Sequence, residues 1–172
     1  MRNQTSCRPL FPVALIAALV IAADQATKWI ILQSVAYMES IPVTGFFNIV
    51  HVRNRGAAFG FLNNADTDWQ IMFFLATTFF ALGVIVWLAL HTEKHDRASL
   101  ISLGGIAGGA IGNAIDRVRL SSVVDFLDFH YAGWHWPAFN VADVAICLGA
   151  ACIALRVLFP PLKTAENAKS KG

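Results

Sequence analysis

Two aspartates, Asp125 in Val-Val-Asp-Phe and Asp143 in Phe-Asn-Val-Ala-Asp, flank the last loop of a chain that is otherwise strongly apolar. Ionised acids next to lipid are costly, so acids placed there are expected to do chemistry. Two carboxylates held close together cannot both ionise easily, so one keeps its proton and the pair offers an acid and a base. Such a pair can hydrolyse a peptide bond, because the ionised member takes a proton from water while the protonated member polarises the carbonyl.

The residues around Asp143 also allow a structural role. Asn140 precedes Asp143 by three residues, which is the pattern of a helix N-cap, and Asn113 and Asp116 repeat this spacing at the end of another apolar stretch. Capping needs only one acid, however, whereas several acids of the last loop reach the same membrane surface. We therefore expect the acids to converge on one site.

Asp24 and Lys28 lie four residues apart within the first apolar stretch. An acid and a base at this spacing share one face of a helix and can pair, which lowers the cost of placing both in lipid. Lys28 can also extend its ammonium toward the outer surface. A structural role in orienting the outer loops is favoured over direct chemistry for this pair.

Metal and thiol chemistry are less well supported. The chain has no His-Glu-x-x-His motif, and its histidines are scattered along it. Asp128, His130 and His135 could in principle bind a metal together, but their aromatic-rich loop is more typical of a membrane interface. We therefore expect no metal and no other cofactor. The cysteines at positions 7, 147 and 152 predict core packing, because an apolar setting suppresses the thiolate.

The composition places the chain in a membrane. Hydrophobic residues make up 56% of the sequence and charged residues only 14%, against roughly 25% charged in a soluble domain. Stretches of about 20 apolar residues match the ~30 Å hydrocarbon core of a bilayer. Four such stretches predict an all-α membrane protein, a single integral membrane domain over 1–172 with transmembrane helices at 10–32, 69–90, 98–115 and 139–159.

The distribution of Lys and Arg predicts the orientation of these helices. Lys and Arg are more numerous in the two terminal segments and the loop around residue 94 than in loops 33–68 and 116–138. The positive-inside rule therefore places both termini in the cytoplasm. The first apolar stretch is too long for a signal peptide and is expected to be retained. With a net charge of +2 and no long basic stripe, the chain is not expected to bind nucleic acid.

The loop after the first span does not have the composition of a disordered linker. Residues 41–62 mix β-branched and aromatic side chains with glycines, which predicts a small sheet of short strands. Asp66 and Asp68 are expected to cap the second helix. Residues 160–172 begin with two prolines and are expected to form a polar tail in the cytoplasm.

The third span carries an unusual set of glycines. Gly104, Gly108 and Gly112 recur every four residues, and Gly105 and Gly109 form a second row beside them. Such a face lets a neighbouring helix approach closely. It could equally admit the helix of a substrate from the side, and the sequence does not separate these two interpretations.

Five sequence blocks, in this order along the chain, resemble the bacterial lipoprotein signal peptidases, also called signal peptidase II. The blocks are DQATK at 24–28, NRGAAF at 54–59, GGAIGNAIDR at 108–117, VVDF at 123–126 and FNVAD at 139–143. The resemblance covers nearly the whole chain. It implies a small β-cradle after the first span, in agreement with the strands predicted there.

The resemblance implies an aspartic endopeptidase that removes the signal peptide from diacylglyceryl-modified prolipoproteins, cleaving just before the lipidated cysteine and requiring no metal. Asp125 and Asp143 are then the catalytic pair. Asp116 is the second candidate for the partner of Asp143, although an ion pair with Arg117 or Arg119 is favoured for it. Carried onto this sequence, the site is lined by Asn54, Gly108, Asn113, Arg117 and Asn140 and supported by Asp24, Lys28 and Asp116.

The resemblance also implies a location in the bacterial inner membrane, with a periplasmic β-cradle and the site at the periplasmic face. The expected partners are the prolipoprotein and membrane lipid, and the enzyme is expected to be monomeric. The alternative class is a small ion- or proton-coupled transporter, in which intramembrane acids relay ions.

Overall fold

The computed structural model of the chain describes residues 9–56 and 69–159. The predictions for Cys7, for residues 57–68 with Asp66 and Asp68, and for the tail at 160–172 lie outside the described residues. The elements are four helices, α1 (Leu10–Ser34), α2 (Trp69–His91), α3 (Arg97–Leu120) and α4 (Val141–Leu158), and four strands, β1 (Ser40–Thr44), β2 (Phe47–Asn54), β3 (Val123–Tyr131) and β4 (Trp134–His135).

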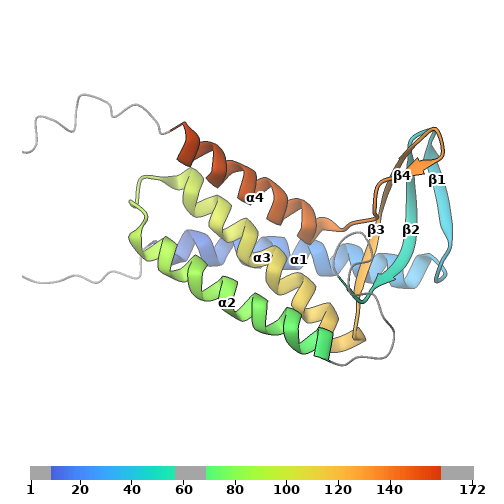
Figure 1. The fold of residues 1–172 in the computed structure, drawn as a ribbon, viewed down its shortest axis with the longest axis horizontal. Coiled ribbons are helices and arrows are strands. Elements are labelled where there is room, and N and C mark those ends of the chain that lie inside the picture. Colours follow the sequence, from blue (N-terminus) through green and yellow to red (C-terminus); the bar gives the residue numbers. More distant parts are fainter. Residues whose placement is uncertain (1–8, 57–68, 160–172) are drawn as a thin grey trace, which may run out of the picture.

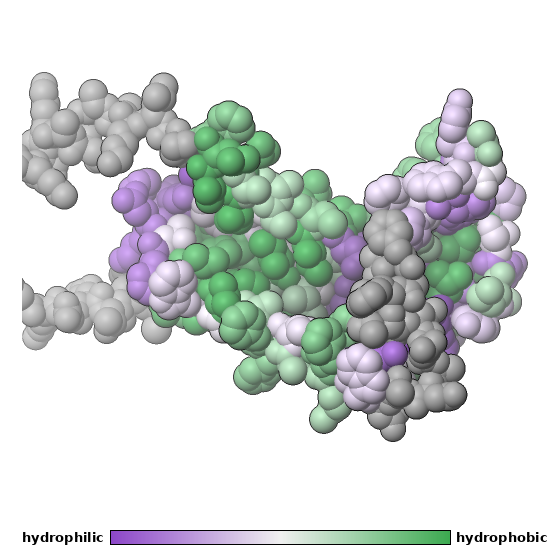
Figure 2. Space-filling model, viewed as in Figure 1, coloured by the Kyte–Doolittle hydropathy of each residue, from purple (hydrophilic) through white to green (hydrophobic). Residues whose placement is uncertain are grey.

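The four helices run antiparallel to their sequence neighbours in one bundle, and the sheet lies across one end of it (Figure 1). Each helix is long and apolar enough to cross a membrane, which confirms the four predicted spans. On the face of the bundle seen in Figure 2, apolar residues cover the side, whereas polar residues gather toward the two ends. α1 begins and α4 ends at the end opposite the sheet (Figure 1).

The helix boundaries lie within two residues of the predicted ones except at the end of α3, and two of the differences have a clear structural cause. α3 continues past residue 115 to Leu120 and ends where Ser121 adopts a left-handed conformation, with φ of 55°. The apolar pattern missed this last turn because it carries Asp116 and Arg117. α4 begins at Val141 rather than at 139, because Asn140 is its N-cap and Phe139 is hydrogen-bonded to β3.

The sheet is antiparallel in the order β1-β2-β3-β4. β1 and β2 confirm the short strands expected after the first span, whereas the strands in the last loop, β3 and β4, were not predicted. In the pairing of β2 with β3, Asn54 lies opposite Val123 and Val52 lies opposite Asp125. Because side chains alternate along a strand, Asn54 and Asp125 project from the same face of the sheet.

The glycine face of α3 is covered by the neighbouring helices of the same chain, α1 and α4. A Cβ at Gly108 would lie 2.7 Å from the carbonyl oxygen of Ala17 in α1, and Gly104 faces the same helix. Gly109 faces α4 at Ala142 in the same way. Of the two interpretations of this face, close packing of neighbouring helices is therefore confirmed, and entry of a substrate helix along it is wrong because α1 and α4 already pack there.

Replacing Gly108 with alanine is expected to destabilise the fold. The added Cβ would force α1 and α3 apart, and overpacking of this kind costs about 1 to 3 kcal/mol. We expect a lower midpoint of thermal unfolding in detergent for Gly108→Ala. The matched control is Gly83→Ala in α2, where a Cβ meets nothing within 4 Å. The control should unfold at the original temperature or slightly above it, because alanine favours a helix over glycine. Equal midpoints for the two variants would contradict this assignment.

Candidate active site

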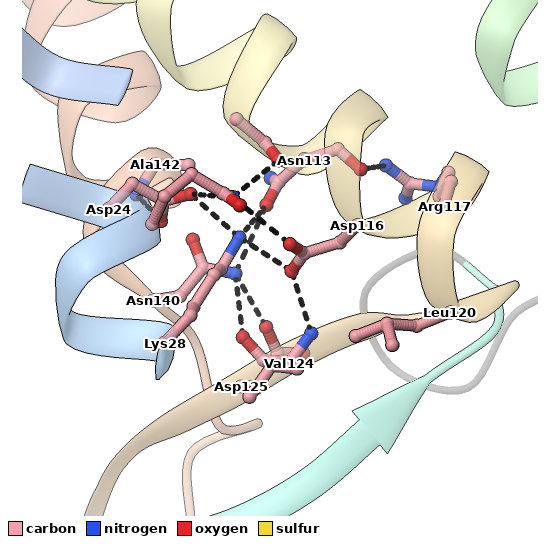
Figure 3. A network of polar contacts seen from close by, with 12 residues as sticks. Asp24, Lys28, Asn113, Asp116, Arg117, Leu120, Val124, Asp125, Asn140 and Ala142 are labelled. Carbon is pink, nitrogen blue, oxygen red and sulfur yellow. Dashed lines mark hydrogen bonds and ion pairs between the residues drawn. The ribbon is translucent and has the colours of Figure 1, made fainter. Parts of the chain in front are cut away.

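A buried ammonium lies at the junction of the helices and the sheet. Lys28 is 2% exposed, and its Nζ lies 2.9 Å from Asp24 Oδ2, from Asp116 Oδ2 and from Asn113 Oδ1. The ammonium points into the middle of these oxygens (Figure 3). The predicted pairing of Asp24 with Lys28 is confirmed, but Lys28 points inward and does not reach the surface.

The carboxylates around Lys28 connect it to the neighbouring elements. Asp24 Oδ1 accepts a hydrogen bond from the backbone N–H of Ala142, which belongs to the first turn of α4, at 3.0 Å. Asp116 Oδ2 accepts one from the backbone N–H of Val124 in β3, at 3.1 Å. N–H groups at the start of a helix lack partners within it, so Asp24 satisfies one of them from α1. The network thus fixes the start of α4 and the start of β3 relative to α1 and α3.

Gln25 is a member of this network that the sequence analysis did not assign. Its Nε2 donates to Asp116 Oδ1 at 3.0 Å and to Asp24 Oδ2 at 3.2 Å. The sequence indicated a role for Gln25 only through its place next to Asp24 in the block DQATK at 24–28. The ion-pair partner of Asp116 is Lys28, so the expected pairing of Asp116 with Arg117 or Arg119 is wrong.

Asn140 connects Asp125 with Asp143. Its side chain and Asp143 form a capping box, in which Asn140 Oδ1 accepts from the backbone N–H of Asp143 and Asp143 Oδ2 accepts from the backbone N–H of Asn140. The remaining amide group, Asn140 Nδ2, donates to Asp125 Oδ1 at 2.7 Å. Capping, predicted from the spacing, is therefore confirmed, and the same asparagine also contacts the second acid.

Asn113 is the second asparagine between the ammonium and the acids. Its Oδ1 accepts from Lys28 and, at 3.2 Å, from Asn140 Nδ2, while its Nδ2 donates to Asp143 Oδ1 at 2.8 Å. Both oxygens of Asp143 therefore accept an N–H group, and its position depends on α3 as well as on α4.

Asp125 has an environment different from that of the acids bound to Lys28. Its side chain is nearly buried in β3, and the amides of Asn140 and Asn54 donate hydrogen bonds to it. Burial and the neighbouring charge of Asp143 raise the pKa of Asp125 to about 7, despite the opposing effects of the two amides and of Lys28. A carboxyl with this pKa keeps its proton for much of the time at neutral pH.

Both aspartates line one cavity of about 510 Å³ at the sheet end of the bundle. Its polar wall consists of Asn54, Asn113, Arg117, Asp125 and Asp143. The rest is mainly apolar and consists of Gly56, Val123, residues 136–139 and the α4 residues Val144, Cys147 and Leu148. A second hollow on α2 is lined only by apolar side chains and glycine, between Ala76 and Trp87, and carries no group for chemistry.

Several expectations are corrected by this geometry. Gly108 was expected to line the site, but it lies in the contact with α1 and is not part of the cavity wall. Cys147 was expected in the core, yet it is exposed and lines the cavity. Within the described ranges no three His, Cys, Asp or Glu side chains gather as metal ligands. His135 instead lies with its Nδ1 2.9 Å from Asp128 Oδ1.

Comparisons with known proteins agree on one family. The model of the family described as signal peptidase (SPase) II matches residues 16–159. The lipoprotein signal peptidase of Nitratidesulfovibrio vulgaris is 48% identical over 136 residues, 78% of this chain and 82% of that protein. The lipoprotein signal peptidase of Oleidesulfovibrio alaskensis is 50% identical over 148 residues, 86% of this chain and 94% of that protein.

Solved structures support the same fold. A bacterial membrane enzyme determined at 2.3 Å resolution superposes with a TM-score of 0.76 and 31% identity, covering 93% of this chain and 91% of that one. A second bacterial membrane enzyme, at 1.9 Å, superposes with a TM-score of 0.75 and 33% identity, covering 86% of this chain and 93% of that one.

Replacing Lys28 with methionine is expected to destabilise the protein strongly. The change leaves Asp24 and Asp116 buried without their cation, and removing one partner of a buried ion pair typically costs about 3 to 5 kcal/mol. Thermal unfolding in detergent measures the loss, with the exposed Lys94→Met as control. Adding Asp24→Asn and Asp116→Asn to Lys28→Met should recover part of the stability. A single Lys28→Met variant as stable as the control would contradict the role of the ammonium.

Replacing Asp125 with asparagine is expected to stabilise the fold in a pH-dependent way. The pKa of Asp125 rises from 3.8 to about 7 on folding, so the buried charge destabilises the fold fully above pH 7 and not at all below pH 4. This cost is of the order of 4 kcal/mol at most, at 1.36 kcal/mol per pKa unit. The unfolding midpoint of Asp125→Asn should therefore exceed that of the original protein at pH 8, by an amount that shrinks toward pH 4.

A control for this measurement uses Asp143. Its charge contributes to the raised pKa of Asp125, so the gain at pH 8 should be smaller when both proteins also carry Asp143→Asn. A difference in midpoint that does not change with pH would show that Asp125 is not destabilised by its charge.

Proposed function

The chain belongs to the signal peptidase II family, and on this premise we propose that it removes the signal peptide from diacylglyceryl-modified prolipoproteins by cleaving before the lipidated cysteine. It is a protease and a multi-pass bacterial membrane protein. The observation that carries the proposed chemistry is the pair Asp125 and Asp143 in one cavity, connected through the side chain of Asn140.

The proposed reaction is the addition of water to the scissile carbonyl. Asp143, whose two oxygens accept N–H groups, takes a proton from the attacking water, while protonated Asp125 donates its proton to the carbonyl oxygen. When the tetrahedral intermediate collapses, Asp143 passes the proton it gained to the leaving amine, and Asp125 takes its own proton back from the hydroxyl. The pair returns to its starting protonation, and no covalent intermediate is needed.

The contacts support Asp125 over Asp116 as the partner of Asp143. Asp116 is bound to Lys28, to Gln25 and to a backbone N–H, and it does not line the cavity. Asp125 lines the cavity, is contacted by neutral amides and has a raised pKa. A carboxyl that has to hold a proton in the resting enzyme suits the second environment.

The remaining site residues hold the pair in place. Asn54, Asn113 and Asn140 donate to the two aspartates, and Arg117 lines the cavity beside them. The residues around the ammonium do not line the cavity; they are Asp24, Lys28 and Asp116. They support the pair indirectly, because the two carboxylates bind backbone N–H groups at the start of α4 and of β3. The apolar part of the cavity wall suits a substrate with a signal helix and two acyl chains. None of these steps requires a metal or another cofactor.

The distribution of charge supports an orientation in the membrane. α1 begins and α4 ends at the end of the bundle opposite the sheet, so the Lys and Arg residues of the two terminal segments belong to that end together with Lys94, Arg97 and Arg156. They outnumber the four arginines of the sheet end, at positions 53, 55, 117 and 119, and the positive-inside rule therefore assigns the opposite end to the cytoplasm. We therefore place both termini in the cytoplasm and the sheet and cavity at the periplasmic face of the inner membrane. We expect the enzyme to work there as a monomer in lipid.

The decisive assay is cleavage of a lipidated prolipoprotein by purified enzyme. Asp125→Asn and Asp143→Asn should each reduce turnover by a factor of about 10⁴ or more, because neither aspartate can replace the other in moving protons. Asp128→Asn is the matched control on the same strand and should retain turnover, because its carboxylate bonds Asn48 and His135 outside the cavity. A chelator should leave cleavage unchanged.

The alternative functions make opposite predictions. If the protein is an ion-coupled transporter, both asparagine variants should leave prolipoprotein processing intact. If Asp116 rather than Asp125 is the partner of Asp143, Asp116→Asn should abolish cleavage without unfolding the protein, while Asp125→Asn retains it.

A further inference from the structure

Arg117 is a cation in the cavity that pairs with no carboxylate among the described residues. Its hydrogen bond within the described residues runs from Nη1 to the carbonyl oxygen of Asn113, one turn earlier in α3, at 3.4 Å (Figure 3). Its Nε is buried without a hydrogen-bond partner. A guanidinium carries five N–H donors, and most of them make no hydrogen bond within the described residues.

The carboxylates whose charge acts on Arg117 are close by. They are Asp143 of α4, Asp125 of β3 and Asp116 of its own helix. Arginine and carboxylate groups readily form bidentate ion pairs. An ion pair with Asp125 or Asp143 would stabilise the ionised state and remove the proton that the two aspartates have to share. The proposed chemistry therefore requires a contact that keeps the Arg117 guanidinium from pairing with Asp125 or Asp143.

The contact that holds Arg117 comes from α2. The Cζ atom of Arg117 lies over the ring of Phe74, 4.4 Å from its centroid, well within the ~6 Å range of a cation–π interaction. The ring of Phe74 is itself in edge-to-face contact with Phe73, at 5.5 Å. Because an aromatic ring offers attraction without a lone pair, this contact anchors the cation and leaves its N–H donors free.

We propose that Phe74 is a positioning residue: its ring holds the Arg117 guanidinium against α2, where it pairs with neither aspartate and offers its N–H donors to a substrate carbonyl. Among the described residues α2 contributes no side chain to the cavity wall. Its buried residues are Gln70, Ile85 and Ala89, and its membrane-spanning part has the smallest buried share of the four described helices. The inference rests on the proposed peptidase function for its kinetic consequence, but not for its effect on Asp125.

The test compares Phe74→Leu, Phe74→Tyr and a protein with trifluorophenylalanine at position 74, using the purified full chain and a lipidated prolipoprotein. Fluorine weakens the attraction of the ring for a cation but hardly changes its size. Phe74→Leu and the fluorinated protein should both lose roughly 2- to 30-fold in kcat, the range of a cation–π contact, while Phe74→Tyr retains activity. The control is Phe79→Leu, an exposed phenylalanine of the same helix, which should behave like the original protein.

The pH profile separates positioning from packing. Once released, the guanidinium approaches Asp125 or cancels the charge of Asp143, and either event stabilises ionised Asp125. The alkaline limb of the pH–rate profile should therefore move to lower pH in Phe74→Leu. An unmoved limb, or a fluorinated protein as active as the original alongside an impaired Phe74→Leu, would overturn the proposal, because the ring would then act by packing alone.

A second readout does not depend on catalysis. The gain in unfolding midpoint that Asp125→Asn gives at pH 8 should be smaller when both proteins carry Phe74→Leu, because a lower pKa of folded Asp125 reduces the cost of its charge. If the original protein fails to cleave prolipoprotein but this gain shrinks, the proposed function is wrong and the role of Phe74 stands. If cleavage occurs and the gain is unchanged, the role of Phe74 is wrong and the function stands.

Discussion

The buried ammonium of Lys28 is the constraint on which the site depends. A charge removed from water costs several kcal/mol unless its surroundings satisfy it, and here three oxygens from two helices do so. The two carboxylates involved each accept a further backbone N–H, one from α4 and one from β3. The elements α1, α3, α4 and β3 must therefore reach their native arrangement before the lysine can be buried. The same arrangement places the asparagines and aspartates of the cavity.

Chemically identical acids acquire different roles through their neighbours. Asp116 contacts the ammonium directly and belongs to the support of the fold. Asp125 lies in β3, where it is bonded by neutral amides and faces the charge of Asp143, so its pKa rises to about 7. The first environment favours a fixed charge and the second favours a proton that can be given and taken back. This separation distinguishes the acids that hold the site together from those suited to chemistry.

The packing of the helices explains how short polar side chains reach one another. The glycine rows of α3 let α1 and α4 approach its backbone closely, and Gly112 leaves room for the carboxylate of Asp24. α1, α3 and α4 thereby form a tightly packed core around the polar network. α2 is less enclosed, and near the cavity it contacts α3 through the ring of Phe74 and the guanidinium of Arg117. One helix can thus influence the electrostatics of the site without contributing to its wall.

The sequence by itself determined what depends on neighbours along the chain. Apolar length predicted four spans, the spacing of Asn140 and Asp143 predicted a helix cap, and the spacing of Asp24 and Lys28 predicted an ion pair. These relations hold within one helix, where the period of 3.6 residues decides which side chains meet. Only the tertiary structure decided that Asp116 pairs with Lys28, that Asn54 and Asp125 share a face of the sheet, and that the glycines are covered by α1 and α4. Those contacts join segments far apart in the sequence, and they form only when burial of the whole bundle brings the segments together.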